Sequence, residues 1–244
     1  MKGEKRMKRL IQSVSIFVVF VLTVVCMTAA ANASYPEPLR QSGAWTDSEL
    51  PPDFFDDDCD GGASCPGRLF VDMPAVGRWS HVPIDWALTR HITVGTGKTT
   101  FSPRQGCTRA QAVTFLWRAA GSPAPSGTDC PFLDVPEDAY YRTAVIWASE
   151  NGITTGTSAT AFSPRETCRR AQIVVFLWRA KGSPAAASSN LRFADVPATA
   201  YYRDAVAWAV EHRITSGTSA DAFSPNLTCT REQIVTFLYR SSRS

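Results

Sequence analysis

The sequence has little of the chemistry that catalytic sites usually need. It contains three histidines, His81, His91 and His212, and they fall at unrelated positions of the internal repeats described below. No Gly-x-Ser-x-Gly elbow, which would present a nucleophilic serine, occurs in the chain. We therefore see no catalytic constellation, and we expect a protein that is not an enzyme.

Long apolar runs are missing beyond the N-terminus. The chain begins with a basic cluster from Lys2 to Arg9, continues with an apolar run from Ile16 to Met27, and reaches a small-residue site at Ala31-Asn32-Ala33. This order is typical of a secretory signal peptide, and the run is shorter than the roughly 18 apolar residues of a spanning helix. We expect residues 1–33 to be removed on export, with an uncleaved anchor as the alternative, and no membrane partner afterwards.

Lysine is scarce in the rest of the chain. Between residues 69 and 244, only Lys98 and Lys181 are lysines among 18 basic residues, and the others are arginines. The planar arginine fork suits carboxylate or phosphate, so this composition favours an anionic partner. Residues 34–66, by contrast, are acidic and rich in Pro, Gly and Ser, which predicts an extended lead-in.

Six cysteines follow the leader, an even number that permits disulfides in an exported protein. Cys59 and Cys65 enclose a short Gly-rich loop, and we expect this pair to be bridged. Three others recur once per repeat, and we expect them to be small buried apolar side chains. A metal site or a bridge to Cys130 is the alternative for these three, which are Cys107, Cys168 and Cys229.

A block of about sixty residues is written three times. A step of 61 residues separates Phe101, Phe162 and Phe223, each followed by Ser-Pro. Periods of this length indicate stacked units, none of which buries its apolar face alone. We predict modules at 67–124, 125–185 and 186–244, each a helix, a loop and a second helix.

The second module shows the expected pattern most fully. Apolar spacing predicts a first helix over 140–150, ended by Asn151-Gly152 in a left-handed cap. The second helix opens on a capping box in the first and third modules, Thr108-x-x-Gln111 and Thr230-x-x-Gln233, whereas Arg169 weakens the cap between them. We expect a core tryptophan and a turn-capping aspartate in each module, the latter with a groove contact as the alternative. They are Trp86, Trp147 and Trp208, then Asp72, Asp134 and Asp195.

Two short motifs resemble ligand-binding loops without fitting them. Gly95-Thr96-Gly97-Lys98-Thr99 looks like the end of a phosphate-binding loop, but Ile92 stands where another glycine is required. Asp56 to Gly61 mimics the start of a Ca²⁺ loop, but Gly67 occupies the twelfth position, where a glutamate belongs. We therefore expect no cofactor, no nucleic-acid partner and no metal.

The segment that opens each second helix carries a family resemblance. It reads Cys107-Thr108-Arg109-Ala110-Gln111, Cys168-Arg169-Arg170-Ala171-Gln172 and Cys229-Thr230-Arg231-Glu232-Gln233. Together with Phe-x-Asp-Val, Phe-x-Pro and Gly152-Ile153-Thr154-Thr155-Gly156, these repeats resemble S-layer homology modules, except that Gln replaces the family's Glu and Cys its Ile. The resemblance implies a mainly α fold in which three modules form a pseudo-threefold spindle with a central three-helix bundle.

The same resemblance implies a function and its residues. Grooves between such modules bind secondary polysaccharides of the bacterial cell wall, typically through a negatively charged, often pyruvylated, sugar. The implied ligand-binding residues are the motif arginine, an aromatic near each module start and a groove glycine: Arg109, Arg170, Arg231, Trp79, Tyr140, Tyr201, Gly95, Gly156 and Gly217. The alternatives are solvated or salt-bridged arginines and aromatic side chains that pack in the core.

Arginine at a helix start brings guanidinium and backbone N–H groups together, which suits an anion. We accordingly expect a secreted protein of a Gram-positive-type bacterium, attached non-covalently to the wall polysaccharide at the cell surface. One alternative is a surface-layer or adhesion component that assembles with other surface proteins. A weaker alternative is an accessory part of a wall hydrolase.

Overall fold

The structure, a computed structural model, describes residues 59, 61–188 and 190–244. By its contacts the chain divides into Met1–Pro52 and Asp53–Ser244, and every described residue belongs to the second unit. The expected signal peptide 1–33, most of the lead-in and the acidic run Asp56–Asp58 lie outside the described residues. Among the helices that the structure describes, none is long and apolar enough to cross a membrane.

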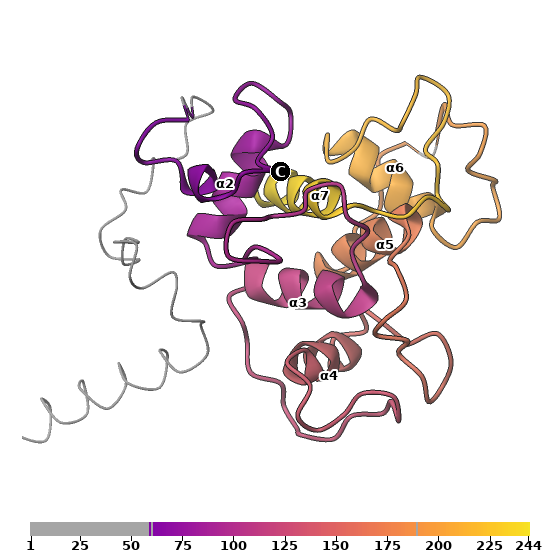
Figure 1. Ribbon diagram of the computed structural model, residues 1–244. Coiled ribbons are helices and arrows are strands. Elements are labelled where there is room, and N and C mark those ends of the chain that lie inside the picture. Colours follow the sequence, from indigo (N-terminus) through magenta and orange to yellow (C-terminus); the bar gives the residue numbers. More distant parts are fainter. Residues whose placement is uncertain (1–58, 60, 189) are drawn as a thin grey trace, which may run out of the picture. The chain divides into compact units, whose positions relative to one another are not determined.

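The described residues form one helix pair in each repeat (Figure 1). After a short 3-10 helix, η3 (Pro66–Leu69), the pairs are α2 (His81–Thr89) with α3 (Arg109–Ala119), α4 (Arg142–Glu150) with α5 (Arg170–Ala180), and α6 (Arg203–Glu211) with α7 (Arg231–Ser242). Extended pairing in this part of the chain is limited to isolated bridges. The mainly α, helix-loop-helix prediction is confirmed.

The second helices of the three repeats form the centre of the fold. α3, α5 and α7 contact one another, and Leu116, Leu177 and Leu238 are buried where they meet. Each first helix packs on the second helix of the neighbouring repeat, α4 on α3 and α6 on α5, while α2 packs on α7. The first repeat therefore closes on the third, and the expected central three-helix bundle is confirmed.

A closed cycle of backbone hydrogen bonds ties the three repeats together. The N–H of Cys107 donates to the carbonyl of Cys229 at 3.0 Å, that of Cys168 to Cys107 at 2.8 Å, and that of Cys229 to Cys168 at 2.8 Å. The three side chains are fully buried and form no disulfide with any described cysteine, and burial raises the pKa of the Cys168 thiol to about 12. The predicted burial is confirmed: each thiol is a small apolar side chain packed where the three repeats converge.

One aspartate in each repeat shapes the loop between the helices. Asp134 accepts hydrogen bonds from the N–H groups of Phe162 at 2.8 Å and Ser163 at 2.7 Å. These bonds hold Ser163 at a φ of 57°, and they place the Phe162 side chain in the core. Asp72 and Asp195 act in the same way in their repeats. The aspartates are caps as expected, but of a loop distant in sequence rather than of their own turn.

The helix borders follow the predicted capping chemistry. Thr108 Oγ1 accepts from the N–H of Gln111 at 3.2 Å, and Gln111 Oε1 accepts from the N–H of Thr108 at 3.0 Å. The same box opens α7. In α5 only half of it forms, from the N–H of Arg169 to Gln172 Oε1 at 2.9 Å, because an arginine side chain has no acceptor to offer.

The first helices bury the repeated tryptophans. α4 begins at Arg142, two residues later than the predicted start, and Gly152 follows it with a φ of 65°, as the left-handed cap requires. The corresponding residues in the other repeats, His91 and Arg213, take the same conformation without being glycine, at φ values of 53° and 56°. The three tryptophans are buried, as predicted: Trp86, Trp147 and Trp208.

Candidate functional site

The three motif arginines are the first residues of the central helices, and their backbone N–H groups are already used. The N–H of Arg109 donates to the carbonyl of Glu166 at 2.8 Å, that of Arg170 to Leu227 at 2.9 Å, and that of Arg231 to Gln105 at 3.0 Å. The next N–H of each helix also donates to a carbonyl of another repeat. The expectation that open N–H groups at these helix starts receive an anion is therefore wrong, because the neighbouring repeat supplies the acceptors.

The arginine side chains are buried, with exposed fractions of 2–3%. Arg109 Nε donates to the carbonyl of Phe162 at 2.8 Å, and its guanidinium lies 4.9 Å from the ring centroid of Phe162 and 5.6 Å from that of Phe176. Arg170 and Arg231 repeat both contacts. The alternative of solvated arginines is therefore wrong, and no ion pair holds them within the described residues.

The terminal nitrogens of the arginines distinguish the three copies. Nη2 of Arg231 donates to the carbonyl of Val94 at 2.6 Å and to Thr93 Oγ1 at 3.3 Å. Nη2 of Arg109 and Nη2 of Arg170 are buried and have no hydrogen-bond partner among the residues that the structure describes. Leaving a charged donor buried without an acceptor is costly, and burial lowers the pKa of all three guanidinium groups. Two of the three copies thus hold a buried cationic donor without an acceptor among the described residues.

The aromatic residues near the module starts are exposed rather than packed in the core. Trp79, Tyr140 and Tyr201 have exposed fractions of 45%, 64% and 67%. Tyr201 and Arg109 perturb each other's pKa, as do Tyr140 and Arg231. Since the loop around each arginine comes from another repeat, residues of all three repeats meet around one guanidinium.

Packing of the loop alone explains why the three predicted groove positions are glycine. A side chain at Gly156 would collide with the Phe132 ring and with the carbonyl of Ala161. Gly217 and Gly95 meet the corresponding phenylalanine ring and carbonyl in their repeats. These positions must be glycine for the loop to pack, so ligand contact at them stays a prediction.

A hollow of about 550 Å³ lies where the first repeat closes on the third. Its charged lining residues are Asp72, Arg78, Arg104 and Glu232, and Glu232 accepts a hydrogen bond from Ser80 Oγ at 2.8 Å. Sequence reasoning did not identify this hollow. The available signal is Glu232 itself, because the aligned positions of the other repeats hold Ala110 and Ala171.

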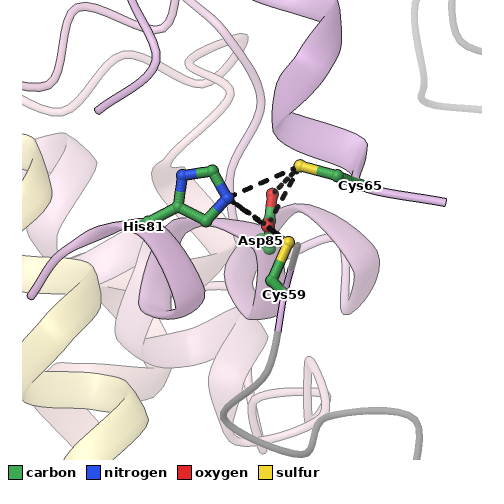
Figure 2. Close-up of side chains that lie close together, drawn as sticks. All are labelled: Cys59, Cys65, His81 and Asp85. Atoms are coloured by element: carbon green, nitrogen blue, oxygen red, sulfur yellow. Dashed lines mark hydrogen bonds and ion pairs between the residues drawn. The ribbon is translucent and has the colours of Figure 1, made fainter. Parts of the chain in front are cut away.

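One group of metal-ligating side chains is present in the described part of the chain, formed by Cys59, Cys65, His81 and Asp85 (Figure 2). The two cysteines are not bonded to each other, so their predicted disulfide stays a prediction. Burial, followed by the charge of Asp85, raises the pKa of Cys65 to about 12, and burial together with a hydrogen bond to Asp85 raises that of Cys59.

Three relatives are named as surface-layer proteins or as an enzyme. An endoglucanase of Bacillus sp. (strain KSM-635) is 31% identical over 160 residues, which are 64% of this chain and 17% of that protein. An S-layer protein of Bacillus thuringiensis subsp. finitimus is 24% identical over 184 residues, 72% of this chain and 22% of that protein. A surface-layer 125 kDa protein of Lysinibacillus sphaericus is 33% identical over 99 residues, 41% of this chain and 8% of that protein. The chain thus spans less than a quarter of the length of each.

The S-layer homology domain matches three tandem segments, residues 69–113, 131–174 and 192–235. Each segment contains one helix pair up to the first turns of its second helix, including the buried arginine. The matches cover more than half of the chain and coincide with the repeats seen in the fold. On this evidence the chain belongs to the S-layer homology domain family.

Proposed function

We propose that this chain attaches non-covalently to a bacterial cell wall by binding an anionic secondary polysaccharide. Membership of the S-layer homology family and the two relatives named as surface-layer proteins support a role at the cell surface. The observation that carries the finer proposal is the pair of buried cationic donors, Nη2 of Arg109 and Nη2 of Arg170, that have no acceptor in the described part of the chain.

An acidic sugar supplies what these donors lack. A carboxylate oxygen, such as that of a pyruvyl group, accepts from Nη2 in a charge-assisted hydrogen bond, which is about twice as strong as a neutral one. The two phenylalanine rings hold the guanidinium in place, so little side-chain entropy is lost on binding. Because Nη2 is covered in the free chain, the neighbouring exposed side chains must move aside to admit the sugar.

The exposed aromatic residue beside each arginine is the second side chain that we expect to contact the sugar. Tyr201 is two-thirds exposed and lies close enough to Arg109 to perturb it electrostatically. An aromatic face offers an apolar surface for the C–H face of a sugar ring, and its hydroxyl offers a hydrogen bond. We assign the same role to Tyr140 beside Arg231 and, by the repeat alignment, to Trp79 beside Arg170.

Sedimentation with purified wall sacculi tests the proposal. The chain should sediment with sacculi and lose this ability when the secondary polymer is removed chemically. The triple variant Arg109→Ala/Arg170→Ala/Arg231→Ala should also stay in the supernatant. Binding that survives removal of the polymer contradicts the polysaccharide proposal, and binding that survives the triple change contradicts the assignment of the arginines.

The repeats provide a matched control. Arg118, Arg179 and Arg240 stand at equivalent positions near the ends of the same three helices, and each donates to the carbonyl of an isoleucine in the preceding loop. Their triple alanine variant removes the same number of charges from the same helices. Arg118 acts electrostatically on Tyr140, and Arg240 lines a hollow with Trp79, so some loss of binding is expected. The variant should still retain far more sacculus binding than the first triple variant, provided that its circular dichroism matches that of the parent.

A second candidate, an assembling surface-layer component, is favoured by the names of two relatives. It predicts that the chain associates with itself or with another surface protein in the absence of the polymer. Analytical ultracentrifugation of the chain, with and without soluble polymer, separates the two functions. A monomer that sediments with sacculi supports anchoring alone.

A further inference from the structure

A compact cluster of potential ligands lies at the start of the first repeat, away from the arginines. Cys59 and Cys65 come from the segment before the repeat, while His81 and Asp85 stand one turn apart on α2 (Figure 2). One ligand atom from each lies within 4.8 Å of all the others. Three of the four residues are buried, and Cys59 is half-buried.

The distances between these atoms match the edges of an empty tetrahedron. With Zn–S bonds of about 2.3 Å and Zn–N and Zn–O bonds of about 2.0 Å, tetrahedral edges are about 3.3–3.8 Å long. His81 Nε2 lies 3.3 Å from Cys59 Sγ, 3.6 Å from Cys65 Sγ and 3.2 Å from Asp85 Oδ2. Asp85 Oδ2 lies 3.0 Å and 3.3 Å from the two sulfur atoms. For these five of the six edges, a cation at the centre therefore needs only shifts of a few tenths of an ångström, and the sixth, between the two sulfur atoms, is within 4.8 Å.

Outer contacts already aim both α2 ligands at the centre. His81 Nδ1 lies 2.6 Å from the carbonyl of Pro74, which places the ring proton on Nδ1 and leaves the Nε2 lone pair facing the sulfur atoms. Gly67 N–H donates to Asp85 Oδ1 at 2.8 Å, which leaves Oδ2 for the cluster. A second hydrogen bond that fixes each ligand is the usual support of a metal site.

The other two repeats show that this arrangement is special to the first. The positions of His81 and Asp85 are occupied by Arg142 and Ile146 in the second repeat, and by Arg203 and Ala207 in the third. Arg142 donates to the carbonyl of Val135 and His81 Nδ1 contacts the carbonyl of Pro74, in each case seven residues earlier in the chain, so the histidine keeps that turn contact. Asp85, however, buries a carboxylate where the fold otherwise buries an apolar side chain, and a buried carboxylate requires a compensating partner.

We propose that Cys59, Cys65, His81 and Asp85 bind one Zn²⁺ in a closed, structural site. Two sulfur ligands with an imidazole favour zinc over the hard cations Ca²⁺ and Mg²⁺, which take oxygen ligands. Four protein ligands leave no open position, so the ion is structural rather than catalytic. It fixes the segment ahead of the first repeat to α2, the helix that closes the repeat ring on α7. This proposal does not depend on polysaccharide binding.

The predicted Cys59–Cys65 disulfide is the competing state of the same pair. Each state uses both sulfur atoms, so one chain molecule cannot hold both. The decisive preparation is the whole chain as secreted, purified without chelator or reductant. We expect about one zinc per chain and alkylatable Cys59 and Cys65 after zinc is withdrawn. A secreted chain with the two cysteines cross-linked in its peptide map and no zinc overturns the proposal.

Cobalt titration of the reduced, metal-free whole chain tests the ligands. Tetrahedral Co²⁺ with two thiolates gives intense visible bands and a near-ultraviolet charge-transfer band, and Zn²⁺ should displace it. The variants Cys59→Ser, Cys65→Ser and His81→Asn should each bind zinc at least about tenfold more weakly, since even outer-contact changes cost 10–100-fold. Cys130→Ser removes a cysteine outside the cluster and should bind as the parent does.

Asp85→Asn separates ligand loss from misfolding. The asparagine retains a carbonyl oxygen for the Gly67 N–H, so helix content by circular dichroism should stay at the parent value while zinc affinity falls. Zinc should raise the melting temperature of the parent chain and of Cys130→Ser, but much less that of Asp85→Asn. Undiminished zinc affinity in Cys59→Ser, Cys65→Ser and Asp85→Asn would falsify the assignment of these ligands.

Discussion

We call the contact between two neighbouring repeats a seam. The seam between the third repeat and the first differs from the other two in the hydrogen bonds of its buried arginine. Arg231 gives its terminal nitrogen to the carbonyl of Val94 and the hydroxyl of Thr93. Arg109 and Arg170, in otherwise equivalent surroundings, leave the same nitrogen without an acceptor. Among the described residues, one seam thus supplies an oxygen acceptor to the arginine Nη2, and the other two do not.

The difference arises in the loop that faces each guanidinium. Thr154 and Thr215 accept from the N–H of Gly156 and Gly217, both at 3.2 Å, and these glycines have φ values of 78° and 85°. Gly95 is not in the left-handed region, and Thr93 turns to Val94 and Arg231 instead. The backbone conformation at one glycine thus decides whether a carbonyl reaches the arginine. We infer that near-identical repeats make unequal grooves.

The largest expected effect is on polymer binding. Arg109→Ala or Arg170→Ala should weaken binding of soluble wall polymer by about 10–100-fold, because a hydrogen bond to a charged group contributes about 1.5–3 kcal/mol. Arg231→Ala should change the affinity severalfold less, because its donor is already used. Isothermal titration calorimetry of the three variants measures this order. Equal losses in all three would remove the distinction between the seams, and no loss in any would indicate that internal water satisfies the orphaned donors.

Stability of the free chain should follow the opposite order. Arg231→Ala should lower the free energy of unfolding by about 1–3 kcal/mol more than Arg109→Ala or Arg170→Ala, since it also removes the charge-assisted hydrogen bonds to the Val94 carbonyl and the Thr93 hydroxyl. Urea denaturation followed by tryptophan fluorescence gives the comparison. A matching loss in all three variants would show that the additional bonds of Arg231 carry no net stability.

The seam between the third repeat and the first also contains the buried hydrogen bond from Ser80 to Glu232, whose aligned positions in the other repeats hold alanine in place of the glutamate. Glu232→Ala introduces the residue of the other two repeats and leaves Ser80 without its acceptor, which should cost about 1–2 kcal/mol of unfolding free energy. The double variant Ser80→Ala/Glu232→Ala should recover part of that loss, because no donor then remains unpaired. An additive double variant in denaturation experiments would argue against coupling between the two residues.

The smallest effect concerns the helix that opens without a threonine. Arg169→Thr should complete the capping box of α5 and raise the unfolding free energy by about 0.5–1 kcal/mol. The lost bond from Arg169 to Asn226, at 3.1 Å and exposed, contributes little in water. Thermal unfolding measures the change in melting temperature when the cap is added to α5 in Arg169→Thr. The same measurement on Thr108→Ala gives the change when the equivalent cap is removed from α3. A melting temperature that does not rise would mean that the Asn226 contact offsets the cap.

Local features of the fold were predictable because neighbouring residues decide them. The Thr108–Gln111 box and the left-handed Gly152 each depend on a few adjacent residues, and the tryptophans follow the helical period. Burial of Arg109, Arg170 and Arg231 was not predictable in this way. Each lies against phenylalanines, of which one comes from a loop 53 residues away in the first two cases and 130 in the third, and no local pattern encodes such a contact.

The cysteine pair illustrates the same limit. The short Gly-rich loop between Cys59 and Cys65 predicts a disulfide. His81 and Asp85 are too distant in sequence to suggest a shared site with these cysteines. A comparison of repeats could have drawn attention to Asp85, an acid at a position that is apolar in the second and third copies. All four ligand atoms come together only because Cys59 and Cys65 fold against α2.

By itself, the sequence determined the repeat period, the helix pairs and their caps, the core tryptophans and the family of the chain. These properties follow from short-range hydrogen bonding and from the spacing of apolar residues. The tertiary structure decided which repeat supplies the partners of each arginine, which donors remain unpaired, and which cysteines meet a histidine and an aspartate. The physical reason is that burial and hydrogen-bond satisfaction depend on groups brought together by the closing of the repeat ring, and their separation along the chain does not reveal them.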